Sequence, residues 1–171
     1  MTQTRGFTLI ELMVTLAVLS ILLTVGVPNF HTFILKNRIS AAANNLIGAL
    51  NLTRSEAIKR GSDVRMIRIG GNAWEGGWQI LSSTNEVIRI YPSISQLTIH
   101  TGNNYLNWVG FHSNGFPFSG GQLPNDAFKI CSSRNPVGVN GRNIFVSRLG
   151  RTRSVDSSCQ FSLFPSAPED E

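Results

Sequence analysis

The fold of this chain depends first on the sequence GFTLIELMVTLAVLSILLTVGV, which runs from Gly6 to Val27. Residues 7–28 are almost wholly apolar, and as a helix rising ~1.5 Å per residue they would be about as long as the ~30 Å hydrocarbon core of a bilayer. We therefore expect a transmembrane helix here. Glu11 is the exception, because an ionised carboxylate inside a membrane is costly unless it is paired. The sequence thus predicts a spanning helix in which Glu11 has a specific partner.

The segment before the apolar run is short and basic. It reads MTQTRG and places Gly6 directly against Phe7. In a secretory signal the small-residue cleavage site follows the apolar region, whereas here the small residue precedes it. A cut between Gly6 and Phe7 would remove a leader of residues 1–6 and leave the apolar helix on the mature protein. The alternative, an ordinary membrane anchor with a stray Glu, explains neither the leader nor Glu11.

The residues at this junction resemble the class III signal of type IV pilins and type II secretion pseudopilins; they are Gly6, Phe7, Thr8, Leu9, Ile10 and Glu11. The resemblance implies that a prepilin peptidase cleaves after Gly6 and methylates the new N-terminal Phe7. It implies that Glu11 pairs with the N-terminal amine of a neighbouring subunit during assembly. It also implies a Gram-negative protein with a single pass through the inner membrane and a periplasmic domain, which later joins other pilins in a fibre at the cell surface.

A second apolar pattern follows the first. Small and apolar residues recur every three or four positions and predict an amphipathic helix over residues 29–61, with a buried face of Ile39, Ala42, Leu46, Ala49, Thr53 and Ala57. The basic residues of this helix are expected in solvent; they are Lys36, Arg38, Arg54, Lys59 and Arg60. We expect a kink or a melted turn near Gly26 and Pro28, and Gly61 as the end of the helix.

After Gly61 the apolar period changes to two, which predicts strands. The expected strands are 63–69, 78–83, 86–91, 97–101, 105–111, 128–132 and 143–149, with a last short strand that includes Cys159 and Phe161. The run from Ser113 to Gly115 is expected at the end of a hairpin. One helix followed only by strands predicts an α+β fold, in which a long N-terminal helix packs on antiparallel β-sheets of a β-rich domain over residues 62–163. Residues 164–171 are expected to be a flexible acidic tail.

Two cysteines, Cys131 and Cys159, lie beyond the apolar helix. In an oxidising compartment such a pair most simply forms one disulfide. Two buried free thiols are the alternative. Two sulfurs without clustered histidines are too few ligands for a zinc site, and no metal is expected.

The sequence gives little support for an enzyme. His31, His100 and His112 lie in separate predicted elements, and no nucleophile elbow, metal motif or phosphate loop of recognisable spacing occurs. We therefore expect neither catalysis nor a cofactor.

The formal net charge of +5 favours an anionic partner, such as nucleic acid or a membrane surface. The basic excess lies late in the chain. Between Ala127 and Gln160 a single acid, Asp156, stands against a group of basic residues; these are Lys129, Arg134, Arg142, Arg148, Arg151 and Arg153.

Gly150 allows a sharp turn after a strand, so that the guanidinium groups of Arg148, Arg151 and Arg153 can project from one edge and grip phosphate bidentately. Phosphate contacts carry no sequence information, which suits capture of any DNA. We expect Lys129, Arg134 and Arg142 as auxiliary DNA contacts. Phe145 and Phe161 are expected in the core, with base stacking as the alternative.

The segment 144–153 resembles the GspH and FimT branch of minor pilins and pseudopilins. In FimT-like pilins of naturally competent bacteria, a GRxR motif at this place is associated with binding incoming DNA, and residues 150–153 match it in full. The resemblance implies a minor type IV pilin that binds DNA through Arg148, Gly150, Arg151 and Arg153 for uptake in natural transformation. Two alternatives remain: a charged strand edge that only discourages aggregation, and a GspH-like minor pseudopilin of a type II secretion system without DNA binding.

Overall fold

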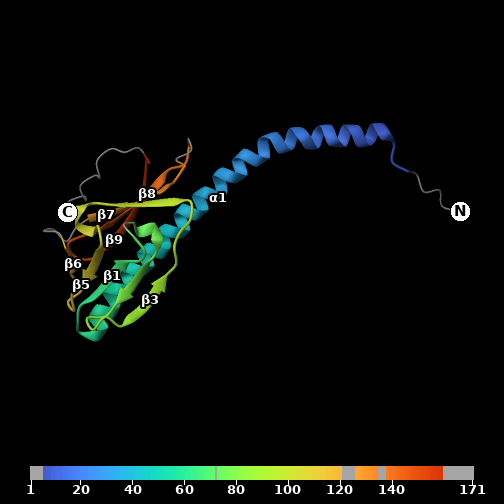
Figure 1. Cartoon of the computed structure of the whole chain (residues 1–171). Helices are drawn as coiled ribbons and strands as arrows, with labels where there is room; N and C mark the ends of the chain where they lie inside the picture. Colours follow the sequence, from blue (N-terminus) through green and yellow to red (C-terminus); the bar gives the residue numbers. More distant parts are fainter. Residues whose placement is uncertain (1–5, 72, 121–125, 135–137, 160–171) are drawn as a thin grey trace. The chain divides into compact units, whose positions relative to one another are not determined.

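The computed structural model describes residues 6–71, 73–120, 126–134 and 138–159 (Figure 1). Most of the expected leader, Phe161 and the expected acidic tail at residues 164–171 lie outside the described residues. The chain divides into two compact units, Met1–Leu35 and Lys36–Glu171, and each is described by itself.

In the first unit the helix α1, Leu9–Arg60, begins with a reciprocal cap. The Thr8 hydroxyl accepts a hydrogen bond from the Glu11 backbone N–H (3.3 Å), and the Glu11 carboxylate accepts one from the Thr8 backbone N–H (3.4 Å). This is a capping box, which satisfies two backbone donors that the first turn of a helix would otherwise leave unpaired. Glu11 therefore has a structural role within its own helix, in addition to the partner that the sequence predicts for it.

The first unit exposes large apolar side chains along α1, such as Leu9, Ile10 and Ile21. Among the described residues, none of the helices combines the length and the hydropathy that a bilayer crossing needs. The spanning role of residues 7–28 stays a prediction. The melted turn expected at Gly26 and Pro28 is wrong, because both positions lie within α1. A proline removes a single hydrogen bond from the ladder, and the turns on both sides remain helical.

In the second unit α1 buries the face that the sequence predicts. The exposed fraction is 2% or less for each of Ile39, Ala42, Leu46, Ala49, Thr53 and Ala57. Gly61, at a φ of +62°, ends the helix in a Schellman motif, with Ser62 N–H donating to Ala57 O and Gly61 N–H donating to Ile58 O. Of the basic residues expected in solvent, Arg54 is wrong, because it is half-buried with an inaccessible Nε.

Two antiparallel sheets accompany this part of α1, which confirms the α+β fold. The first has the order β3-β2-β1-β5-β6, with β1 Val64–Arg68, β2 Trp78–Leu81, β3 Val87–Tyr91, β5 Trp108–Phe111 and β6 Pro117–Ser119. The second has the order β4-β7-β8-β9, with β4 Leu97–Thr101, β7 Asp126–Ser132, β8 Gly141–Val146 and β9 Thr152–Ser157. Short helices η1, Trp74–Gly76, and η2, Asn103–Tyr105, lie in the connections.

The core joins these elements through aromatic contacts. The Trp74 ring lies edge-on to Phe128 at 5.1 Å, and Tyr105 stacks on Phe128 at 5.4 Å. The Trp74 indole N–H donates to the Tyr105 carbonyl (2.8 Å). Burial raises the pKa of the Tyr105 hydroxyl far above its ordinary value, and the nearby Asp126 carboxylate raises it further, so this side chain stays neutral.

The strand predictions fail mainly at β6, Pro117–Ser119, where no strand is predicted, and at β9. The predicted strand 143–149 ends at Val146, and β9 covers Thr152–Ser157, where no strand is predicted. Arg153 therefore lies in β9 and Arg151 directly before it. Cys159 follows β9. The sequence of β9, TRSVDS, has no apolar alternation, because this edge strand has exposed or half-exposed residues on both faces.

A disulfide joins Cys131 of β7 to Cys159, with a Cα–Cα distance of 5.8 Å. The alternative of two free thiols is therefore wrong. Gly141 lies against the bridge, where a Cβ atom would come within 2.6 Å of the Cys159 sulfur. The bridge ties the chain after β9 to the middle of its sheet.

Candidate nucleic-acid interface

The predicted arginine motif forms the turn between β8 and β9. Gly150 N–H donates to the Ser147 carbonyl (2.9 Å), and Ser147 N–H donates to the Arg151 carbonyl (2.9 Å). Gly150 has a φ of +75°, in the left-handed region. A type I turn followed by a left-handed residue in a bulge is a common short hairpin connection. The sharp turn predicted at Gly150 is confirmed, and it leaves Arg148 exposed at the tip.

Close packing also requires a glycine at position 150. A Cβ atom there would lie 2.5 Å from the carbonyl oxygen of Gly115, which is in the turn between β5 and β6. Arg54 of α1 donates from Nη1 to the Gly150 carbonyl (3.2 Å). The hairpin tips of the two sheets therefore meet beside α1.

Strand alternation separates the residues of the motif. Thr152, opposite Val146, donates from its hydroxyl to Asn51 Oδ1 of α1 (3.2 Å). Because successive side chains of a strand point to opposite faces, Arg151 and Arg153 lie on the other face, about 6.6 Å apart along the strand. Both are exposed. The GRxR pattern thus places its two arginines on the face away from α1.

These arginines are the uncompensated charges of the hairpin. Within the described part of the chain, the side chains of Arg148, Arg151 and Arg153 form neither an ion pair nor a hydrogen bond, although the side chains of other arginines do. Arg60, for example, is 2.8 Å from Glu56 and 3.1 Å from Glu86. Contact with Arg60 lowers the pKa of the Glu56 carboxyl. None of the described acidic residues forms an ion pair with these three arginines, so their guanidinium groups are available to an external anion.

The structure does not bring the expected auxiliary residues to the β8–β9 turn. Lys129 is 8% exposed in the middle of β7, where it pairs with Asn143. Arg142 forms an ion pair with Asp156 (3.4 Å). Arg134 is exposed beyond the end of β7 that lies farthest from the β8–β9 turn. Phe145 is 8% exposed and belongs to the core, as the sequence predicts.

Sequence reasoning missed the roles of Asn51 and Arg54, which hold the hairpin from an element far away in the sequence and which nothing in the local pattern marks. Gly115 lies at a hairpin end, between β5 and β6, as expected, but its close approach to Gly150 is not visible in the sequence. His112, by contrast, has an ordinary structural role, since its Nδ1 lies 3.0 Å from Asp63 Oδ1 and its ring stacks on Phe118.

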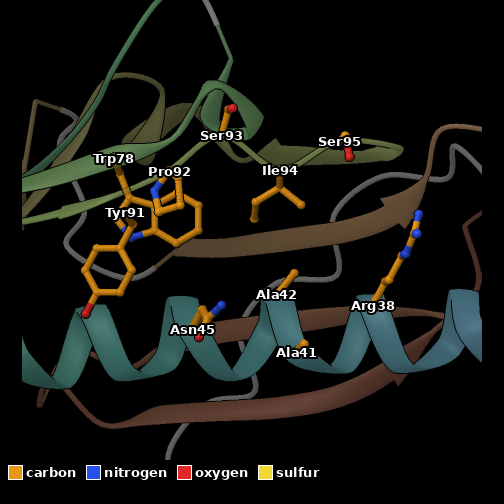
Figure 2. A pocket seen from close by; sticks show the side chains of 10 residues that line it. All are labelled: Arg38, Ala41, Ala42, Asn45, Trp78, Tyr91, Pro92, Ser93, Ile94 and Ser95. Atoms are coloured by element: carbon orange, nitrogen blue, oxygen red, sulfur yellow. The ribbon is translucent and has the colours of Figure 1, made fainter.

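A separate cavity of about 420 Å³ lies between α1 and the connection from β3 to β4. Figure 2 shows Arg38 and Asn45 on the helix and Trp78, Tyr91 and Pro92 on the opposite side. None of the motif arginines lines it. The lining has no acid and no histidine, and the described residues contain no cluster of three or more potential metal ligands. The β8–β9 hairpin is therefore the stronger candidate site.

Comparisons with known proteins agree with this fold. The family model described as type II transport protein GspH matches residues 42–150, and the prokaryotic N-terminal methylation motif matches residues 1–27. The GspH match ends at Gly150, so Arg151 and Arg153 lie just beyond it.

Two crystal structures of the type IV minor pilin FimU of Pseudomonas aeruginosa (strain PAO1) have a similar fold. The first is 21% identical in sequence, with a TM-score of 0.57, and the match covers 68% of this chain and 91% of the FimU chain. The second is 22% identical, with a TM-score of 0.58, and the match covers 71% of this chain and 90% of the FimU chain. Family and fold together indicate a structural protein rather than an enzyme. The chain therefore belongs to the GspH family, as a minor pilin or pseudopilin that carries the N-terminal methylation motif.

Proposed function

We propose that this minor pilin binds DNA, without sequence preference, through the β8–β9 hairpin. The observation that carries the proposal is the group of exposed arginines Arg148, Arg151 and Arg153 on one turn and strand, which have no partner among the described residues. Each guanidinium can donate two parallel hydrogen bonds to a phosphate.

The setting of β9 also supports this proposal. β9 is an edge strand that pairs only with β8 among the described residues, so a long polyanion can approach it along its free side. The spacing of about 6.6 Å between alternate residues of a strand is similar to the distance between neighbouring phosphates of one nucleic-acid strand. Arg151 and Arg153 can therefore contact successive phosphates. Binding of this kind releases counterions and weakens steeply with salt.

The N-terminal methylation motif supports a proposal for where the protein acts. We propose cleavage after Gly6 and methylation of Phe7 by a prepilin peptidase, with a single pass through the inner membrane and a periplasmic domain before assembly with other pilins. The fibre would then carry the arginine hairpin to incoming DNA for natural transformation. The exposed apolar side chains of α1 between Leu9 and Phe33 supply the surface that lipid, and later other subunits, would cover.

Substitutions of Glu11 test the assembly role. If the carboxylate pairs with the N-terminal amine of a neighbour, both Glu11→Ala and Glu11→Gln should insert normally yet be recovered at least about tenfold less in sheared fibres, since an isolated charge pair in an apolar setting is strong. Gln can still form the capping box with Thr8. Immunoblots of membrane and fibre fractions measure both steps. Wild-type recovery of the Gln variant would show that only helix capping matters.

The binding test uses the full-length protein in a mild detergent, because α1 exposes apolar side chains. Fluorescence anisotropy with several random duplexes should give similar affinities for all of them. Raising the salt from about 50 to 200 mM should weaken binding by an order of magnitude or more if three phosphates are contacted. Absence of binding at low salt, or strong preference for one sequence, would refute the proposal.

A second candidate is a minor pseudopilin of a type II secretion system that binds no nucleic acid. The description of the matching family, type II transport protein, favours it. Under this candidate the arginines would only keep the edge of β9 soluble. The anisotropy experiment separates the two functions, because the pseudopilin would leave DNA unbound at every salt concentration.

A further inference from the structure

We propose that Arg54 and Thr152 are positioning residues that fasten the arginine hairpin to α1, and that Arg54, although cationic, does not contact phosphate. This inference rests on the proposed DNA-binding function. It concerns how the motif arginines are held, and it assigns a role to the variable position of the GRxR pattern.

Two residues of α1 form hydrogen bonds with two residues of the hairpin. Asn51 and Arg54 are three apart on the helix, which places them on one face. Gly150 closes the turn, and Thr152 is the first residue of β9. Asn51 Oδ1 accepts from the Thr152 hydroxyl at 3.2 Å, and Arg54 Nη1 donates to the Gly150 carbonyl at 3.2 Å. The hairpin is thus held at two nearby points, the carbonyl of Gly150 and the hydroxyl of Thr152.

The guanidinium of Arg54 is wedged between the two hairpin turns. A Cβ atom on Gly150 would lie 3.2 Å from Arg54 Nε, and a Cβ atom on Gly115 would lie 3.1 Å from the same nitrogen. Nε itself is buried and has no acceptor among the described residues. Bidentate binding of phosphate by an arginine needs two parallel N–H donors free at one edge. Arg54 has one donor committed to Gly150 and another enclosed, so it is suited to hold the turn.

The consequence is that Thr152 is not a neutral spacer between the two arginines. If the hairpin loses its contacts with α1, the side chains of Arg151 and Arg153 can take up many relative positions. The apparent affinity of a ligand falls in proportion to the fraction of protein in the competent arrangement. Losing a fastening contact should therefore weaken DNA binding without removing a phosphate contact.

Salt titrations of DNA binding by full-length variants distinguish positioning from direct contact. Arg54→Gln should weaken binding about threefold to tenfold, and Thr152→Val about threefold, since a single hydrogen bond shifts a population by such factors. In both variants the slope of log affinity against log salt should equal that of the wild type. Thr152→Ser should restore binding. Lys59→Gln, on the same helix and with the same charge change, should leave the affinity within about twofold.

Other results would overturn the inference. A fall of about one in the salt slope of Arg54→Gln would make Arg54 a phosphate contact. If the Thr152→Val variant binds DNA as tightly as the wild type, the Thr152 hydroxyl does not help to hold the hairpin. The Val variant keeps a β-branched side chain in a strand, so it tests the inference even if the Arg54 variant folds poorly.

Amide hydrogen exchange without DNA separates this inference from the proposed function. Amides of residues 147–153 should exchange severalfold faster in Arg54→Gln and Thr152→Val than in the wild type, because the hairpin opens more often. If the two variants exchange faster than the wild type but the wild type binds no DNA, the proposed function is refuted, whereas the role of Arg54 and Thr152 in holding the hairpin on α1 is supported. Unchanged exchange in both variants would refute the fastening whatever the DNA result.

Discussion

Replacing Arg151 and Arg153 together by Gln should weaken DNA binding by at least about a hundredfold at moderate salt. Hydrogen bonds to charged groups contribute ~1.5–3 kcal/mol each, and ~1.4 kcal/mol corresponds to a factor of ten in affinity. Both side chains are exposed, in or directly before an edge strand, and have no internal partner among the described residues. Their loss should therefore leave the fold intact and remove binding alone, as measured by fluorescence anisotropy of the full-length protein.

The matched control removes the same total charge elsewhere. Lys59→Gln with Arg89→Gln alters two exposed residues, one near the end of α1 and one in β3 of the other sheet. Affinity for DNA should stay within about threefold of the wild type, since these charges act only at long range through salt. If this control weakened binding as much as the arginine pair, net charge rather than the hairpin would be responsible.

Gly150→Ala should destabilise the protein by about 2–5 kcal/mol. A left-handed backbone costs a residue with a side chain ~1–2 kcal/mol, and the crowding of a new methyl group against a packed neighbour costs ~1–3 kcal/mol more. The crowding is against backbone, because the Gly115 carbonyl oxygen lies 2.5 Å from the position of the new Cβ. Thermal unfolding followed by circular dichroism should show a melting temperature lower by about 10 °C, and DNA binding should weaken as well.

Gly61→Ala is the control for the conformational part of this effect. Gly61 has a similar φ of +62°, but a Cβ atom there would have no neighbour within 4 Å. It should therefore cost only the ~1–2 kcal/mol of the left-handed backbone. An equal loss of stability in the two variants would show that the packing of the two hairpin tips contributes nothing.

The parts of the structure that sequence predicts are those with a local signal. The buried face of α1 from Ile39 to Ala57 follows from apolar residues at helical spacing, and Gly61 ends the helix as expected. Gly150 is likewise predicted as a turn residue, because a glycine directly after a predicted strand is a local signal. β9 escaped prediction because an edge strand with two exposed faces needs no apolar alternation.

The supports of the candidate site could not be predicted, because they are non-local. Arg54 reaches a carbonyl 96 residues away, and Asn51 accepts from a hydroxyl 101 residues away. In the sequence Arg54 is one of several basic residues on the polar side of a helix. Likewise, nothing in the local sequence distinguishes Lys129, which the sheet buries, from the exposed Arg153. Only the register of β7, β8 and β9 separates these cations into structural and exposed ones.

If Arg151 and Arg153 each contact a DNA phosphate, the salt dependence of binding must reveal both contacts. Each phosphate contact contributes about 0.9 to the slope of log affinity against log salt for duplex DNA. The slope of the Arg151→Gln, Arg153→Gln variant should therefore be smaller than that of the wild type by about two. A variant that binds more weakly but keeps the wild-type slope, or that binds as well as the wild type, would contradict the claim.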